Sequence, residues 1–460
     1  MEVGMVRLII WASVCLFILT LSVAAQNYII LGWNDLGMHC SNKDFSTLTV
    51  LPPFNTVMAQ AIQVGDAVNP PQIITTNFHV TYEIPGNTYS VGKTNFWDFE
   101  DQIFGVTLPD NIGLTGIGLT GDMSVDIDHF VAVGIPLTPF QDADLINEAP
   151  FQLGLLKLYD QFDQLLASTN PVVPVSNEIN CLSSGCHLSE QAILNQHAAE
   201  AGFDPGNTPI LCATCHASNA LGMAGNPNLP SLSEAIHKHH GEYTDDCYKC
   251  HPGPVTHCLR DVMSVKHGFV CQTCHGSVTQ VGESISSGRE PWFQEPSCGA
   301  LSCHGPNFAE EPGKLYRMSR GHGGLYCSAC HGEPHAIVPS REPNDNLQNI
   351  SLQGHAGTLD MCIVCHGVVP SGAGPHGVLA SNCCLHPGDA DHNTIVRILD
   401  VTFMISAIYK NGPHPPCNGS IDGQYPEADA NGNGAFNILD VTYLIAYLYK
   451  SGPAPICGPA

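Results

Sequence analysis

The 460-residue sequence has few basic and few aromatic side chains. It carries 16 Lys and Arg against 42 Asp and Glu, a formal net charge of −26 at pH 7, and only 7% of its residues are aromatic. Nucleic-acid binding needs Lys and Arg that neutralise phosphates, so this balance excludes nucleic acid as a partner. With few aromatics, 45 Gly and 34 Pro, the side chains alone make a poor conventional core.

Long apolar runs are also missing, except at the N-terminus. Arg7 precedes an apolar run from Leu8 to Val23, and the small residues Ala24 and Ala25 follow it. This pattern predicts a secretory signal peptide over residues 1–25, with an uncleaved anchor as the alternative. The run is shorter than a usual membrane span, and no later segment could cross a membrane as a helix. We therefore expect a secreted protein, periplasmic, extracellular or at the cell surface, with no transmembrane segment after signal cleavage.

Cysteine and histidine, in contrast, are abundant, with 21 Cys and 23 His. Five stretches read C-x-x-C-H and two more read C-x4-C-H. Chance would give on the order of 0.05 C-x-x-C-H matches in a chain of this composition, so the repetition is not accidental. The paired cysteines are Cys181 and Cys186, Cys212 and Cys215, Cys247 and Cys250, Cys271 and Cys274, Cys298 and Cys303, Cys327 and Cys330, and Cys362 and Cys365. The histidines that follow them are His187, His216, His251, His275, His304, His331 and His366.

This spacing suits covalent attachment of haem. Two thiols add to the two vinyl groups at one edge of a porphyrin, and the histidine that follows lies under the ring to bind iron. Zinc sites need pairs of C-x-x-C that complete four-ligand tetrahedra, whereas each unit here offers three ligands. A disulfide scaffold would leave the seven adjacent histidines unexplained. We therefore predict seven c-type haems, which would also provide the apolar bulk that the composition lacks.

A second axial ligand decides whether a haem iron carries electrons or binds substrate. Ten histidines lie in or near the motif region without belonging to a motif, and this number favours two imidazoles at most irons. For His39, beside Met38 and Cys40, an ordinary structural role is favoured over haem or copper ligation. The predicted second ligands are His197, His237, His240, His267, His322, His335 and His355.

The region before the motifs has a different texture. Residues 26–175 contain one cysteine, Cys40, and Phe78 to Ile84 alternate apolar and polar residues as a half-buried strand does. Residues 151–166 fit a helix or a hairpin, and Pro171 to Pro174 are predicted to be a linker. We expect a multidomain protein: a β-rich N-terminal domain over residues 26–175, a loop-rich, haem-packed cytochrome domain with little regular secondary structure over 176–380, and a small α domain over 383–460.

The C-terminal region contains a two-fold repeat, in which Ile398 to Thr402 recur as Ile438 to Thr442. Each copy follows an EF-hand-like loop, whose oxygen ligands wrap a hard cation such as calcium. The first loop departs from the pattern at Thr394, where the second has a glycine, and at Arg397. The predicted calcium ligands are Asp389, Asp391, Asn393 and Asp400 in the first loop, and Asp429, Asn431, Asn433 and Asp440 in the second.

Each loop is expected to lead into a short helix, over residues 401–409 and 441–449. Four cysteines of this region are expected to form disulfides whose pairing stays open. They are Cys383, Cys384, Cys417 and Cys457. Cys40 and Cys258 are then left over, and pairing between these two is one option.

The seven motifs, over residues 181–376, resemble those of multihaem c-type cytochromes with bis-histidine haems. Residues 32–40 are similar to a block found ahead of the haem region in some environmental members of that family. The resemblance implies respiratory electron transfer through a haem wire to redox partner proteins or an extracellular acceptor, with self-assembly in some members. The repeat over residues 388–455 resembles a type I dockerin. That resemblance implies attachment to a cohesin-like domain, and a calcium-stapled module without a partner is the alternative.

These observations favour an electron carrier over an enzyme. The main alternative is a multihaem oxidoreductase that acts on a nitrogen or sulfur oxyanion at one open haem, although the sequence has no C-x-x-C-K variant. A surface adhesion protein with accessory haems is a third option.

Overall fold

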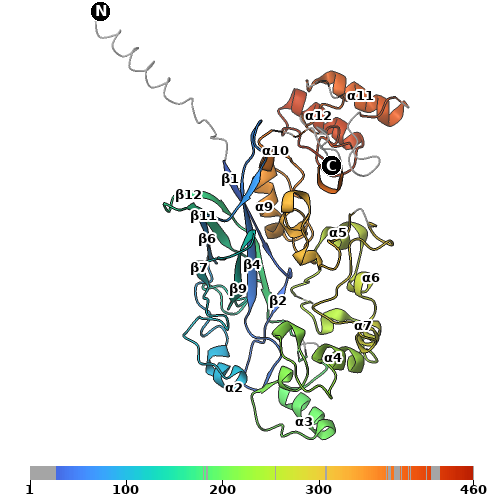
Figure 1. Cartoon of the computed structure of the whole chain (residues 1–460). Helices are drawn as coiled ribbons and strands as arrows, with labels where there is room; N and C mark the ends of the chain where they lie inside the picture. The colour runs from blue at the N-terminus through green and yellow to red at the C-terminus, as the bar shows by residue number, and fades with distance from the viewer. Residues whose placement is uncertain are drawn as a thin grey trace, which may run out of the picture.

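The computed structural model describes residues 27–179, 181–182, 185–253, 255–305, 308–368, 370, 374–377, 384, 386–391, 393, 395–410, 412–415 and 425–458. The predicted signal peptide, Thr394, Cys383 and Cys417 lie outside these residues. Within them, β-sheets form one side of the molecule and short helices follow one another along the other side (Figure 1).

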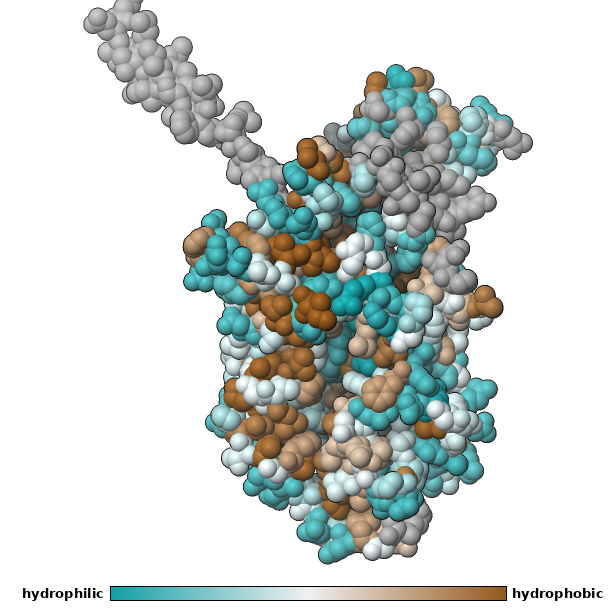
Figure 2. Space-filling model, in the orientation of Figure 1, coloured by the Kyte–Doolittle hydropathy of each residue, from teal (hydrophilic) through white to brown (hydrophobic). Residues whose placement is uncertain are grey.

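The N-terminal region is β-rich, as predicted. Two antiparallel sheets share a core that includes Val80, Phe130 and Leu158. On the face shown in Figure 2, apolar residues lie in patches over these sheets, interspersed with polar residues. The first sheet has the order β1 (Tyr28–Asn34), β4 (Asn55–Gln63), β9 (His129–Ile135) and β8 (Ser124–Asp126), with β5 (Gln72–Ile74) also paired to β4. The second has the order β12 (Leu165–Thr169), β11 (Leu155–Asp160), β6 (Phe78–Glu83) and β7 (Thr120–Asp122).

Two smaller sheets connect distant parts of the chain. One has the order β10 (Phe151–Leu153), β13 (Val172–Ser176) and β2 (His39–Cys40), and in the other β14 (Ile210–Leu211) pairs with β3 (Leu48–Thr49). Strands β10 to β12 show that residues 151–166 form extended structure and not a helix. The prediction of a linker over Pro171 to Pro174 is wrong, because β13 is buried along its whole length and this burial outweighs the proline signal.

The region of the Cys motifs contains a series of short helices. They are α3 (Glu190–Ala201), α4 (Leu232–His240), α5 (Val262–His267), α6 (Cys271–His275), α7 (Val278–Ser286), α8 (Cys327–His331), α9 (Pro343–Gln353) and α10 (Ile363–His366). The expectation of a loop-rich, haem-packed domain with little regular secondary structure is therefore wrong. The physical reason is local capping: the side chains of Ser231, Asp261 and Ser277 each accept a hydrogen bond from a backbone N–H of the first helical turn. Helices α5, α6, α8 and α10 have only four to six residues, which is too short to show an apolar periodicity in the sequence.

The motif region packs directly on the sheets. Strand β14 pairs with β3, α8 contacts β1 and α9 contacts β10. The backbone N–H of Asn34 in β1 donates to Glu333 Oε1 at 3.0 Å, and that of Gly32 donates to Gln348 Oε1 at 2.8 Å. The sheets therefore support the backbone that carries the motifs.

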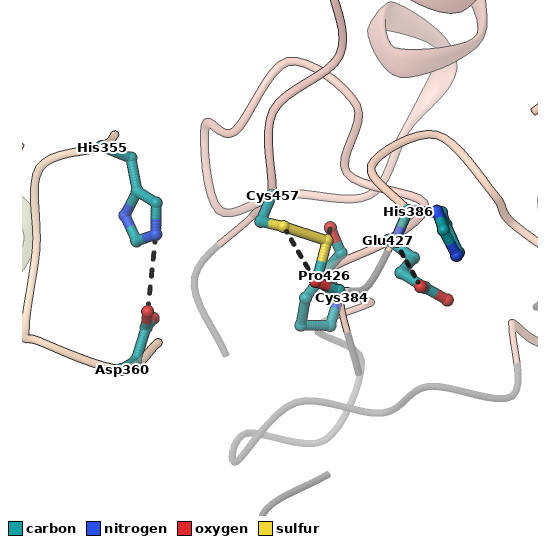
Figure 3. Close-up of a disulfide and its surroundings, with 7 residues drawn as sticks. All are labelled: His355, Asp360, Cys384, His386, Pro426, Glu427 and Cys457. Carbon is teal, nitrogen blue, oxygen red and sulfur yellow. Dashed lines mark hydrogen bonds and ion pairs between the residues drawn. A yellow bond between two sulfur atoms is a disulfide. The ribbon is translucent and has the colours of Figure 1, made fainter. Parts of the chain in front are cut away.

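The C-terminal region contains α11 (Ile398–Tyr409) and α12 (Ile438–Lys450), which pack on each other around Met404 and Leu444. Both predicted helices are present and begin three residues earlier than expected. A disulfide joins Cys384 to Cys457 next to this pair (Figure 3). Over the described part of the chain, no helix has the length and apolar character needed to cross a membrane.

Candidate functional site

A large cavity runs along the motif side of the molecule. Its volume is about 3940 Å³, and its lining includes all fourteen motif cysteines and all seven motif histidines. Protein interiors are close-packed, with few voids larger than a water molecule. Pockets for one small ligand measure about 300–1,000 Å³. The space is therefore suited to several large groups rather than to one.

Each C-x-x-C-H motif is a single helical turn. The backbone N–H of His216 donates to the carbonyl of Cys212 at 3.0 Å, and His251 and His366 make the same bond to Cys247 and Cys362 at 2.9 Å. In α6 and α8 the motif itself is the helix. In the second of the two C-x4-C-H motifs, the backbone N–H of His304 donates to the carbonyl of Cys298 at 3.2 Å. This turn places the first cysteine and the histidine close together, as attachment of one haem requires.

Six of the motif histidines face a second histidine ring at nearly constant distance. A metal–nitrogen bond is about 2 Å long, so two imidazoles on opposite sides of one metal ion have ring centres about 6 Å apart. The pairs, with their centroid distances, are His187–His240 at 6.1 Å, His197–His216 at 5.9 Å, His237–His251 at 6.0 Å, His275–His335 at 6.1 Å, His331–His376 at 6.0 Å and His322–His366 at 5.9 Å.

Five of the seven predicted second ligands take part in these pairs: His197, His237, His240, His322 and His335. The other two do not. His355 places Nε2 3.4 Å from Asp360 Oδ1 (Figure 3), and the ring of His267 lies against Phe269.

The partner of His331 is His376, which was not among the predicted second ligands. His376 follows the last motif, at Cys362 to His366. Among the described residues, His304 has its ring against Phe308, with centroids 6.4 Å apart, and not against a second imidazole.

Three of the paired histidines are held in the neutral form by their surroundings. Burial, followed by the neighbouring His237, lowers the pKa of His251 to about 4. Burial and His376 lower the pKa of His331 to about 4, and burial and His275 do the same for His335. A neutral imidazole is the form that binds a metal.

Cysteines of different motifs lie close enough to shift one another's pKa. Burial and the Cys181 thiol raise the pKa of Cys212 to about 11, and burial followed by Cys181 and Cys186 raises that of Cys250. A hydrogen bond from Cys247 lowers the pKa of Cys271 to about 7.

The same kind of contact continues through the later motifs. Burial and Cys303 raise the pKa of Cys274. Burial, Glu310 and Cys327 raise the pKa of Cys298 to about 12, and burial and Cys365 raise that of Cys330 to about 12. These neighbours define one row of motifs. Named by their first cysteines, the order is Cys212, Cys181, Cys247, Cys271, Cys298, Cys327 and Cys362. The first two motifs are in reverse order, and from Cys247 onward the row follows the chain from the region of α4 in the lower part of Figure 1 to α10 near the top.

A buried ionic cluster joins this row to the sheets, and sequence analysis missed it. Arg260 is 1% exposed, and its Nε and Nη2 donate to the two carboxylate oxygens of Asp345 at 2.6 and 3.0 Å. Its Nη2 also lies 3.7 Å from Glu333 Oε2, and burial, followed by Asp345, raises the pKa of Glu333 to about 8. No sequence motif signals this cluster, because its three residues come from separate segments.

The predicted calcium loops bring their acidic groups together. Ligand oxygens of Asp389, Asp391 and Asp400 all lie within 4.8 Å of one another. In the second loop Asp429 accepts hydrogen bonds from the backbone N–H groups of Asn433 and Gly434, at 3.2 and 2.7 Å. The first loop thus gathers its carboxylates even though Arg397 departs from the EF-hand pattern.

Comparisons of the chain with protein-family models, with curated proteins and with solved structures found no match.

Proposed function

We propose that this protein carries seven c-type haems and transfers electrons along them. One observation carries the proposal: six motif histidines face a second imidazole at 5.9–6.1 Å across a cavity that all fourteen motif cysteines line. Two thiols could bond the porphyrin, and one histidine in the same turn with a second histidine across a gap could bind the two faces of its iron, as in a covalently bound, six-coordinate haem. Haem iron closed on both faces exchanges electrons without binding substrate.

The arrangement of the chain supports this proposal over a zinc scaffold. A zinc site needs ligand atoms that converge on one point. Among the described residues, Asp389, Asp391 and Asp400 have ligand atoms that all lie within 4.8 Å of one another. No group of three Cys and His among these residues brings its ligand atoms this close together. The order of the motifs in one row supports a path with two ends, at the Cys212 and Cys362 motifs. The net charge of −26 favours basic or metallic redox partners.

The test is the colour of the matured protein. The proposal expects a red protein that keeps its pigment in acidified organic solvent, because thioether bonds hold the porphyrin. A colourless protein, or pigment that leaves with the solvent, would contradict it. Substitution of Cys298 and Cys303 by Ala is expected to remove one seventh of the haem.

A second candidate is an oxidoreductase for a nitrogen or sulfur oxyanion, and the position of His304 favours it. Its ring packs on Phe308, which cannot bind iron, whereas the six other motif histidines face a second imidazole. Carbon monoxide added to the reduced protein would distinguish the two functions. Binding at one haem in seven supports the enzyme, and no binding supports the electron carrier.

The C-terminal repeat is proposed to bind calcium and to attach the protein to a cohesin-like partner. Its two helices expose equivalent residues: Tyr409 is 61% and Tyr449 is 62% exposed, and Leu399 and Leu439 are exposed as well. Equivalent exposed residues on both repeats provide two similar surfaces for a partner. Pull-down with an immobilised cohesin, in calcium and in chelator, tests this.

A further inference from the structure

We propose that Cys40 and Cys258 form a disulfide that fastens the motif region to the sheets. Neither residue belongs to a C-x-x-C-H or C-x4-C-H motif. Both are free thiols in the structure, partly buried, and both line the large cavity. This inference does not depend on haem attachment.

Hydrogen bonds from β13 hold the two backbones together on one side. Cys40 ends β2 and lies opposite Ser176 in the pairing with β13. The hydroxyl of Ser176 lies 3.0 Å from that of Thr256, two residues before Cys258. The carboxylate of Glu178 accepts from the backbone N–H of Thr256 at 2.8 Å. The backbone just before Cys258 is therefore tied to the strand that pairs with Cys40.

Arg260 holds the same two segments on the other side. Its Nη1 donates to the carbonyl of Gly37 at 2.8 Å and to the carbonyl of Cys258 at 3.1 Å. One nitrogen thus connects Cys258 itself to the segment three residues before Cys40. Because Arg260 is also fixed by Asp345, this connection is rigid.

The surroundings of the two thiols raise the pKa of each. Burial, followed by Cys258 and Glu178, raises the pKa of Cys40 far above that of a free thiol. Burial also raises the pKa of Cys258, to about 11. A thiolate is the reactive form, so both groups react slowly once the site is closed. We therefore expect the bond to form during folding and then to resist reductants.

The reaction is thiol–disulfide exchange with a disulfide donor of an oxidising compartment. The Sγ–Sγ bond between Cys40 and Cys258 forms, the donor's S–S bond breaks, and two electrons and two protons leave with the donor as two thiols. The product pins the segment between the third and fourth motifs against β2.

Peptide mapping of the mature full-length protein tests the inference. The protein is denatured without reductant, treated with iodoacetamide and digested, and the peptides are identified by mass spectrometry. We expect the peptides of Cys40 and Cys258 to be joined and unlabelled, and both cysteines to be labelled after reduction. Label on either cysteine before reduction, or a bond from either to another cysteine, would overturn the inference.

Two variants keep the test decisive. Cys258→Ser is expected to leave Cys40 open to labelling without reductant, while the Cys384–Cys457 disulfide stays unlabelled as the matched control. Cys40→Ser/Cys258→Ser is expected to lower Tm relative to the protein with the bond intact. If labelling reached the motif cysteines while Cys40 and Cys258 remained joined, the haem proposal would fail and this inference would stand.

Discussion

His331 and His376 face each other with ring centroids 6.0 Å apart, although one belongs to the sixth motif and the other follows the seventh. A motif therefore supplies two thiols and one imidazole, and the second imidazole comes from elsewhere in the chain. His237 and His240, both on α4, extend this pattern, because one helix serves two motif histidines.

Removal of a second imidazole should change the spin state of one haem. His376→Ala leaves His331 as the sole histidine at its site, so we expect one haem in seven to become high-spin and to bind carbon monoxide when reduced. Electron paramagnetic resonance and carbon monoxide difference spectra measure this. The matched control is His355→Ala, because His355 contacts Asp360 and faces no motif histidine. A spectral change in the control but not in His376→Ala would show that the pairing is wrong.

Removal of a site within the row should interrupt the path of electrons. Cys298→Ala/Cys303→Ala deletes the fifth position of the row. We expect electron equilibration between the remaining haems to slow sharply, as measured after flash reduction. Cys212→Ala/Cys215→Ala deletes an end position and is the control, since its six remaining sites stay connected. Equal slowing in both variants would contradict the order of the row.

The buried ionic cluster should be important for stability. Arg260→Met leaves Glu333 and Asp345 buried without their cation, so the free energy of unfolding should fall by about 3–5 kcal/mol. Urea unfolding of the mature protein measures it. Lys314 forms a more exposed ion pair with Glu311, and Lys314→Met should cost about 0–1 kcal/mol. A comparable loss in both variants would argue against the cluster's role.

Chelation of calcium should destabilise the C-terminal region. Without a cation the buried carboxylates of each loop repel one another, so EGTA is expected to lower the Tm of this region and calcium to restore it. Asp429→Ala/Asp440→Ala should reduce the number of calcium ions bound by one in isothermal titration calorimetry. Asp163→Asn, a change at an exposed carboxylate of the N-terminal region, is the control. An unchanged stoichiometry in the double variant would count against the second loop as a site.

The sequence predicts the parts of this structure that depend on local spacing. The alternation in β6 and the helices after the calcium loops both arise from residues within a few positions of one another. The secondary structure predicted for the motif region was wrong because its helices depend on single capping residues such as Ser231. Pro174 suggested a linker, but burial of β13 between β10 and β2 decides its conformation.

The second histidines could be predicted only in part, because tertiary structure selects them. His322 lies just before a Cys pair and faces a motif histidine, whereas His355, in a similar position, turns to Asp360. The contact between Arg260 and Asp345 could likewise not be predicted from the sequence, because neither residue belongs to a local sequence motif.

The intact mass of the mature protein tests the central claim most directly. Each c-type haem adds about 616 Da, so seven thioether-bound haems should raise the mass of the polypeptide by about 4.3 kDa. A mass equal to that of the polypeptide alone would contradict the account.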